Sequence, residues 1–513
     1  MRAWLQVLVE KMLRSLPGIS TIFLLIRPLK SLSAASRWKE IERSVLFGQI
    51  RMHYPERLAK IVLIEGDITE DDFGISESDL VRVLSKTSVV FHCAATVSMV
   101  EKLKKAANMN VHGVKRMIAL CHRMPKLEPG EKIEEKVYLS GFDADKLLTA
   151  VENLDDTQAD FMSGLLTKKL YNTYCLTKVL GEQIVKNERD LPALIFRPSI
   201  IVGVWKDGLP GWVPAFQGIA ALIGAMYTGA LPRVPMLSHN PKSILDCVPV
   251  DAVVSMMIVC AGYRMNLHTE EAPVFHCCTS ELSPFSLQKQ LTIAHKYAME
   301  YPTEKFLSSP SFNLGGFQCV ESLRHKMRVG CMRPVLDKLT TLFRQQPFWT
   351  RLYRKVGYAY TALLPFTRHY QFESTGMLKL IGMMNEEDRN TFDFDVRKIN
   401  WTEFSCNGMM GMKIFLMKDD DEGAIRRTKI RLISHQLISL LPVFVIFYMI
   451  SVLVSRSFTA WQIFLPLMII AIMFSLKSWC TCTKIKPLEE YREEIEMIMG
   501  EPIKSKKDKT PMA

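Results

Sequence analysis

The feature that most constrains the fold is a series of short, fully apolar runs that alternate with helical patterns over residues 1–265. A short apolar run without alternation is typical of a strand covered on both faces. Strands that alternate with helical segments favour βαβ units on a parallel sheet. Residues 1–265 therefore predict an α/β domain with a doubly wound parallel sheet. The predicted strands are Thr21–Ile26, Ile61–Ile64, Val89–Phe91 and Ala193–Phe196.

The rest of the chain changes character twice. Residues 266–425 carry longer amphipathic patterns with proline and aromatic interruptions, and they predict a second, mostly helical domain. Two apolar segments follow, Ser434–Val454 and Thr459–Leu476, each long enough or nearly so to cross a hydrocarbon core of about 30 Å. Their basic flanks favour a hairpin with both ends in the cytosol, and a shallow re-entrant hairpin or a single longer crossing are the alternatives. Residues 477–513 predict a basic cytosolic tail.

Composition narrows the class of protein. With 513 residues, 48% of them apolar, the chain can bury a large core, which excludes a disordered protein. The net charge of +12 comes without basic and aromatic repeats or zinc-ligand spacing, so we expect no nucleic-acid partner and no metal. The basic residues concentrate near the apolar C-terminal segments, which favours a lipid bilayer as partner. The unpaired spacing of the 12 cysteines indicates reduced cytosolic thiols, and the N-terminus predicts an amphipathic helix, not a signal peptide.

Tyr174 and Lys178 are the candidate catalytic residues. They stand four positions apart at the start of a helical pattern, which places the phenol and the ammonium on one face. A lysine there favours the phenolate, so it lowers the tyrosine pKa from about 10 toward the range useful for proton transfer to a carbonyl oxygen. Two exposed residues on a helix face are the alternative. His92, which follows the third apolar run, is interpreted as a packed core histidine.

A second set of residues lies where the predicted strands end, the edge at which an open α/β sheet binds its ligand. Arg27 ends the first strand, where a cation favours the 2′-phosphate of NADPH; an exposed loop arginine is the alternative. Asp67 and Ile68 follow the second strand. The Asp67 carboxylate is placed to accept a hydrogen bond from the adenine amine, and Ile68 is placed to cover the adenine ring.

The later strands carry the rest of the predicted cofactor site. Ala94 and Ala95 end the third strand, and their small side chains let a cofactor approach the backbone. Asn110 begins a helical pattern and is predicted to bind a main-chain carbonyl or an active-site water, with helix capping as the alternative. Pro198 and Ile200 follow the fourth strand, where a backbone turn is placed to cup the nicotinamide.

These pieces, in this order, resemble the alcohol-forming fatty acyl-CoA reductases, members of the extended short-chain dehydrogenase group. The segment Phe392–Arg397, followed by Trp401, resembles the helical C-terminal domain of that family, so the resemblance covers essentially the whole chain. It implies a Rossmann-like NADPH-binding domain over residues 1–265, a helical domain over residues 266–425 and a membrane anchor over residues 434–476. The other matching motifs are Leu25-Ile-Arg27, Gly66-Asp67, Val90-Phe-His-Cys-Ala-Ala-Thr-Val97, Tyr174-Cys-Leu-Thr-Lys178, Arg197-Pro-Ser-Ile200, Pro210-Gly-Trp212 and Cys247-Val-Pro-Val-Asp251.

The resemblance implies reduction of a long-chain fatty acyl-CoA by two successive hydrides, through an aldehyde, to a primary alcohol and free CoA. In that scheme Tyr174 protonates the carbonyl oxygen and Lys178 holds the nicotinamide ribose. Arg27 binds the 2′-phosphate of NADPH and Asp67 binds the adenine. The expected partners are the acyl-CoA and a bilayer, with a homodimer left open. The expected location is the endoplasmic reticulum or peroxisomal membrane, with the catalytic domain in the cytosol.

Two family elements have no counterpart in the sequence. The family begins with a strand and a Thr-Gly-x-x-Gly-x-x-Gly turn that holds the pyrophosphate at a helix N-terminus, whereas here the first glycine is Gly18. The family also carries a strand ending in Val-Ser-Thr-x-Tyr, whose hydroxyl helps to polarise the carbonyl, and the sequence near Pro125–Lys136 lacks it. Loss of two strands predicts buried edges with unpaired backbone groups. A truncated start and a skipped exon are our hypothesis for the two gaps.

Two other functions compete with the membrane-anchored reductase. The first is a catalytically impaired or inactive family member that acts as a lipid-binding or partner-binding membrane protein, which the missing elements favour. The second is an enzyme for steroid or sugar-nucleotide substrates on the same core. The C-terminal segment Phe392–Trp401 argues against that second alternative.

Overall fold

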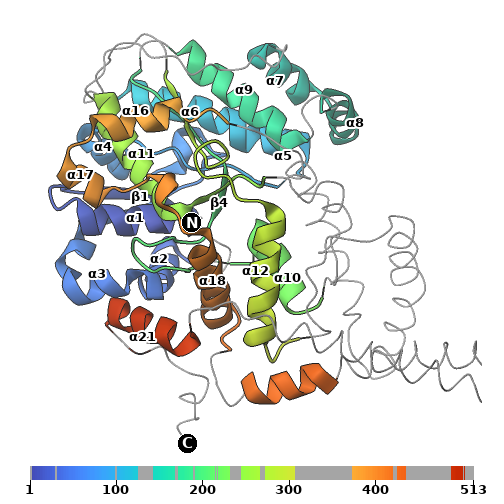
Figure 1. Cartoon of the computed structure of the whole chain (residues 1–513). Coiled ribbons are helices and arrows are strands. Elements are labelled where there is room, and N and C mark those ends of the chain that lie inside the picture. The colour runs from blue at the N-terminus through green and yellow to red at the C-terminus, as the bar shows by residue number, and fades with distance from the viewer. Residues whose placement is uncertain are drawn as a thin grey trace, which may run out of the picture.

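The computed structural model describes residues 3–28, 32–98, 101–124, 143–167, 172–188, 191–213, 215–216, 218–230, 244–265, 272–306, 372–419, 425–434, 487–500 and 502. Its first half alternates strands and helices, and its later helices pack against that half (Figure 1). The strands are β1 (Ile22–Ile26), β2 (Ile61–Glu65), β3 (Ile195–Pro198), β4 (Ile200–Val202), β5 (Cys247–Pro249) and β6 (Val274–Cys277).

The helices of the first half are α1 (Ala3–Ser15), α2 (Ala34–Glu42), α3 (Gly48–His53), α4 (Glu77–Lys86), α5 (Leu103–Ala107), α6 (Gly113–His122), α7 (Ala144–Asn153), α8 (Asp156–Leu166), α9 (Thr173–Asn187), α10 (Gly218–Tyr227) and α11 (Val250–Met265). A π-helical turn, η4 (Asn108–His112), joins α5 to α6. The later helices are α12 (Leu287–Glu300), α16 (Thr375–Met383), α17 (Glu386–Thr391), α18 (Trp401–Gly411) and α21 (Leu488–Met499).

Within these described residues the strands form three separate parallel pairs. β1 pairs with β2, β3 with β6, and β4 with β5. Parallel pairing with interleaved helices agrees with the predicted α/β, Rossmann-like class. The predicted doubly wound sheet was expected to be incomplete, and the structure divides it further, because no ladder joins the three pairs to one another in the described part of the chain.

The predicted strand Val89–Phe91 is wrong, since residues 88–98 form no strand. A strand needs a hydrogen-bonded neighbour, and no described strand pairs with these residues. A side chain takes over part of the missing ladder: the Asn110 amide accepts from the Thr96 N–H at 2.8 Å and donates to the Thr96 carbonyl at 3.2 Å.

The main hydrophobic core extends across the domain boundary expected at residue 265. Strand β6 pairs with β3, so the chain after residue 265 supplies a neighbour to a strand of the first half. Helices α12 and α18 also pack into the core that α1 and α10 form. Fully buried members of this core from six helices are Leu8, Tyr227, Val254, Tyr297, Met410 and Ile495.

The expected basic tail contains a helix that packs back on the protein. Helix α21 lies beside α3 and α18, in red in Figure 1. The Tyr491 hydroxyl donates to the Pro210 carbonyl at 2.6 Å, and its ring is fully buried. The residues that form the buried face recur at helical spacing, a stripe that predicts such packing. They are Leu488, Tyr491, Ile495 and Met499.

No helix in the described ranges is long and apolar enough to span a membrane. The predicted membrane segments Ser434–Val454 and Thr459–Leu476 lie outside the described residues, apart from Ser434.

Candidate active site

Helix α9 presents the predicted catalytic pair. The Asn172 side chain accepts a hydrogen bond from the Cys175 N–H at 2.8 Å and caps the helix just before Tyr174. Tyr174 therefore stands in the first turn and Lys178 in the next, on the same side of the helix. Both side chains line one cavity.

This cavity has a volume of about 1620 Å³. Single-ligand pockets usually measure about 300–1,000 Å³, so two ligands fit side by side. Its walls come from residues 88–97, from α9, from the β3–β4 segment and from α10 and α18. Helix α9 lies above β4 in Figure 1, whereas α10 and α18 lie below it. The side chains from α10 and α18 are mostly apolar, including Ile219, Ile223 and Met409.

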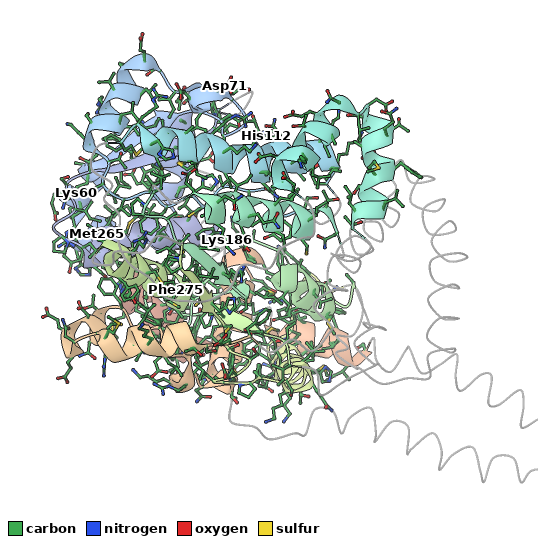
Figure 2. The ribbon with its side chains drawn as sticks, turned by 90° about the horizontal axis from the view of Figure 1, so that it is seen from above. Lys60, Asp71, His112, Lys186, Met265 and Phe275 are labelled. Carbon is green, nitrogen blue, oxygen red and sulfur yellow. The ribbon has the colours of Figure 1, made fainter. Side chains whose placement is uncertain are left out.

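Figure 2 shows the same arrangement from above. The N-terminal elements that carry Asp71 and His112 lie on one side, and β6 with Phe275 lies on the other. Lys186, near the end of α9, lies between them. The catalytic helix thus occupies the boundary between the two groups of elements.

The structure brings six of the predicted site residues to the cavity wall. They are Ala95, Asn110, Tyr174, Lys178, Pro198 and Ile200. The other four, Arg27, Asp67, Ile68 and Ala94, do not line it. Ile68 is only 7% exposed and packs with Phe73, so its side chain points into the core instead of offering a surface to a ring.

Asn110 holds two walls of the cavity together. Its side chain is buried, and besides the two bonds to Thr96 its amide donates to the Thr177 hydroxyl at 2.9 Å. Thr177 lies between Tyr174 and Lys178 on α9. The contact with the Thr96 carbonyl corresponds to the main-chain bond expected of Asn110, and it links residues 88–98 to the helix that carries the catalytic pair.

Arg27 and Asp67 form a surface ion pair where β1 and β2 end. Nη1 of Arg27 lies 3.3 Å from the Asp67 carboxylate, and the arginine side chain is 54% exposed. Partial burial acts to raise the pKa of Asp67, but the Thr69 N–H at 3.1 Å and the Arg27 guanidinium outweigh it and lower that pKa. Asp67 is therefore ionised, and it keeps the Arg27 side chain at the end of the strand.

His92 is a residue whose place the sequence did not predict. It lines the cavity with Tyr174 and Lys178 instead of packing in the core. Its Nε2 is buried and has no hydrogen-bond partner among the described residues. Burial and the nearby Lys178 ammonium lower the pKa of His92 to about 4, so the ring is neutral at physiological pH. The available signal was its position at the end of an apolar run, the edge where ligands bind.

The chain matches known families over both halves. The NAD-binding family described as Male sterility protein matches residues 6–257, and the Sterile family with the same description matches residues 332–419. Fatty acyl-CoA reductase 2 of Homo sapiens is 29% identical over 441 residues, covering 83% of this chain and 85% of that protein. Fatty acyl-CoA reductase 1 of Gallus gallus is 29% identical over 434 residues, covering 82% of this chain and 83% of that protein.

Among solved structures, the terminal R domain from the myxalamid PKS-NRPS biosynthetic pathway has a similar fold. Its TM-score is 0.51 at 13% identity, and the match covers 79% of this chain and 86% of that one. The similar fold and the match to the NAD-binding family together define the class of protein: a nicotinamide-dependent oxidoreductase with a Rossmann-like fold. Both family matches and the relatives agree along most of the sequence, and the chain belongs to the fatty acyl-CoA reductases. The resemblance drawn from the motifs is confirmed.

Proposed function

We propose that this chain uses NADPH to reduce a long-chain fatty acyl-CoA to a primary fatty alcohol at a membrane surface. The observation that carries the proposal is the cavity, which joins Tyr174 and Lys178 to an apolar wall from α10 and α18. Its volume accommodates a nicotinamide and an acyl chain together. One thioester, two NADPH and two protons give one alcohol, one free CoA thiol and two NADP⁺.

Each side chain of the site has a defined part in this scheme. The bound nicotinamide supplies hydride to the acyl carbon. Tyr174 gives its proton to the carbonyl oxygen as negative charge develops there. Lys178 holds the ribose and favours the phenolate that remains. Pro198 and Ile200 lie in the cavity wall where β3 passes into β4, the place proposed for the nicotinamide ring.

The preference for NADPH rests on two arginines at the end of β1. Nη1 of Arg37, on α2, donates to the Arg27 carbonyl, so a second guanidinium lies at the end of β1, against the Arg27 backbone. The exposed pair of Arg27 with Asp67 is worth at most about 1 kcal/mol. A 2′-phosphate makes charge-assisted bonds to guanidinium that are stronger than such a pair, and it therefore replaces Asp67 as the partner of Arg27.

The described residues fit the nicotinamide and 2′-phosphate ends of NADPH. The second candidate function is a catalytically impaired member of the family that binds acyl lipid in the same largely apolar cavity.

A cofactor titration separates the two candidates. The full chain in detergent micelles is titrated with NADPH and with NADH by fluorescence, with Arg27→Ala as the test variant. Arg82→Ala, which breaks an exposed pair with Asp79, is the matched control. We expect saturable NADPH binding that Arg27→Ala weakens by about 10-fold or more, because a hydrogen bond to a charged group is worth about 1.5–3 kcal/mol. NADH binding and the Arg82→Ala variant should not change. Absence of NADPH binding by the folded chain would establish the impaired form.

Membrane attachment by a hairpin is supported by the residues on either side of the apolar segments. In residues 425–434, Leu432 is fully buried and Nζ of Lys429 lies 2.8 Å from the Glu300 carboxylate. After the segments, α21 packs on the same body through Tyr491. A single crossing would separate these two flanks, whereas a hairpin returns the chain to the side it left. We place the catalytic domain on the cytosolic face of the endoplasmic reticulum or peroxisomal membrane, and we expect protease to reach both flanks from that face in intact vesicles.

A further inference from the structure

A buried histidine nitrogen faces the proposed reaction site. His92 lines the same cavity as Tyr174 and Lys178, and its buried Nε2 has no hydrogen-bond partner in the described part of the chain. A buried polar group without a partner destabilises the folded state, because it has lost its hydrogen bonds to water. Such a group is retained where a ligand completes its hydrogen bonding.

The chemistry of the ring suits a hydrogen bond to an oxygen that gains negative charge. Burial and the Lys178 ammonium lower the pKa of His92 to about 4, so the ring carries one N–H and no charge. A neutral donor stabilises a developing oxyanion and does not compete with Tyr174 as the source of the proton.

The segment that carries His92 is tied to α9 through one buried side chain. Its segment is tied at Thr96 to the Asn110 amide, which is in turn bonded to Thr177 on α9. His92 therefore stands on a wall whose link to the Tyr174 and Lys178 helix runs through one buried side chain. A donor held in this way is preorganised toward the same space as the tyrosine hydroxyl.

We propose that His92 is a carbonyl-polarising residue, whose Nε2–H donates a hydrogen bond to the acyl oxygen that Tyr174 protonates. This inference rests on the proposed function. It assigns to an imidazole on residues 88–98 the part that a Ser or Thr hydroxyl plays on the strand that the sequence lacks. No covalent bond forms at His92; the hydrogen bond shortens as the oxygen gains charge and lengthens after the proton arrives.

The test observes the bound carbonyl directly and needs neither cofactor nor turnover. Palmitoyl-CoA labelled with ¹³C at the thioester carbonyl is bound to the full chain in detergent micelles, and its C=O stretch is recorded by difference infrared spectroscopy. The variants are His92→Leu, His92→Gln and Tyr174→Phe. His53→Leu, a histidine outside the cavity lining, is the control.

We expect a carbonyl band at lower frequency than in buffer, which moves back toward the buffer value in His92→Leu and keeps part of its displacement in His92→Gln, because the Gln amide also donates. With NADPH, kcat of His92→Leu should fall by about 100-fold to 1,000-fold, the usual effect of losing one oxyanion donor, with KM little changed. His53→Leu should match the wild type in both measurements.

The outcomes are distinguishable. If the carbonyl band of bound palmitoyl-CoA is displaced equally in the wild type and in His92→Leu, the role assigned to His92 is overturned and the reductase proposal stands. Failure of the folded chain to bind palmitoyl-CoA overturns both. If His92→Leu does not fold, as judged by circular dichroism, His92→Gln decides the question. Its carbonyl band and its kcat and KM are then compared with those of the wild type.

Discussion

Replacement of Asn110 by alanine tests whether one side chain takes the place of a strand ladder. In the structure this amide makes three hydrogen bonds: 2.8 Å and 3.2 Å to the backbone of Thr96 and 2.9 Å to the Thr177 hydroxyl. Asn110→Ala removes all three at once. Thr177 still donates to the Thr173 carbonyl at 3.0 Å. The groups that lose their hydrogen-bond partner are therefore the N–H and the carbonyl of Thr96.

Each unmet buried group costs about 1–3 kcal/mol, which for two groups gives about 2–6 kcal/mol. Thr96 is only partly buried, so water reaches part of this backbone and the lower end applies, about 2–3 kcal/mol. If the free energy of unfolding decreases by about 3 kcal/mol per molar urea, the urea midpoint should fall by roughly 1 M. The slope of this free energy against urea concentration should not change.

Two measurements check this value. Urea unfolding gives the change in free energy, and hydrogen exchange of the peptide that contains residues 88–98 shows where it arises. Asn153→Ala, which removes an exposed bond to the Thr149 carbonyl on α7, is the control, and we expect a change below about 0.5 kcal/mol. An Asn110→Ala variant that unfolds like the control, with unchanged exchange at Thr96, would refute the reasoning.

Three further predictions concern stability. A Cβ on Gly411 would lie 1.9 Å from the Gly211 carbonyl oxygen, so Gly411→Ala should lower the melting temperature by loosening α18 from residues 203–212. A Cβ on Gly382 would have no atom within 4 Å, so the control Gly382→Ala should be neutral or stabilising. Equal melting temperatures of the two variants would contradict the Gly411–Gly211 contact. The pKa of His92 is lowered to about 4 in the folded chain. Below pH 6.5 the imidazole therefore binds a proton in the unfolded chain but stays neutral in the folded chain. Stability should therefore fall between pH 6.5 and 4 by up to about 1.4 kcal/mol per pH unit, and urea midpoints of His92→Leu should fall less steeply. Tyr491→Phe removes the 2.6 Å bond to Pro210 and should cost about 1 kcal/mol in urea unfolding; no loss would mean that α21 is held by its apolar face alone.

The extent to which the sequence predicts this fold follows from how each strand is specified. The runs at β1, β2 and β3 were recognisable because each is apolar and flanked by helical patterns. The run at Val89–Phe91 has the same local pattern and forms no strand, because a ladder depends on neighbours elsewhere in the chain. Strands β4, β5 and β6 were missed, since runs of only three or four residues carry too little pattern, and β5 ends in a proline while β6 contains a histidine.

The candidate site was predictable where spacing alone sets geometry. Tyr174 and Lys178 share a helix face, and four positions along a helix fix that relation wherever the helix lies. His92 was missed for the opposite reason: whether a histidine at a strand end packs in the core or faces a cavity depends on the strands beside it. The roles of Arg27 and Asp67 toward NADPH stay predictions, because their ion pair lies outside the cavity lining.

The division of the sheet changes what determines the width of the active site. In a continuous sheet, neighbouring strands lie about 4.8 Å apart, so the backbone sets the distance between catalytic walls. Here residues 88–98 and β3 border the cavity with no described ladder between them, and side chains span the two halves. Arg197 of β3 is one such tie, because its Nη2 lies 2.6 Å from the Glu182 carboxylate on α9. Another is on α1, where Lys11 and Arg14 lie 2.5 Å and 2.8 Å from the Asp207 carboxylate.

This ion pair is only partly buried, since the Asp207 side chain is 24% exposed, so breaking it should cost less than the roughly 3–5 kcal/mol of a fully buried pair. Asp251 reinforces the second tie, because it accepts the backbone N–H groups of residues 205–207. The Arg197–Glu182 pair joins the β3 wall to α9, Asn110 joins residues 88–98 to α9, and Asp207 joins the segment after β4 to α1. Substitutions at Asn110, Lys11 or Asp207 should therefore alter substrate geometry as well as stability, whereas substitutions within the β1–β2 pair should alter stability alone.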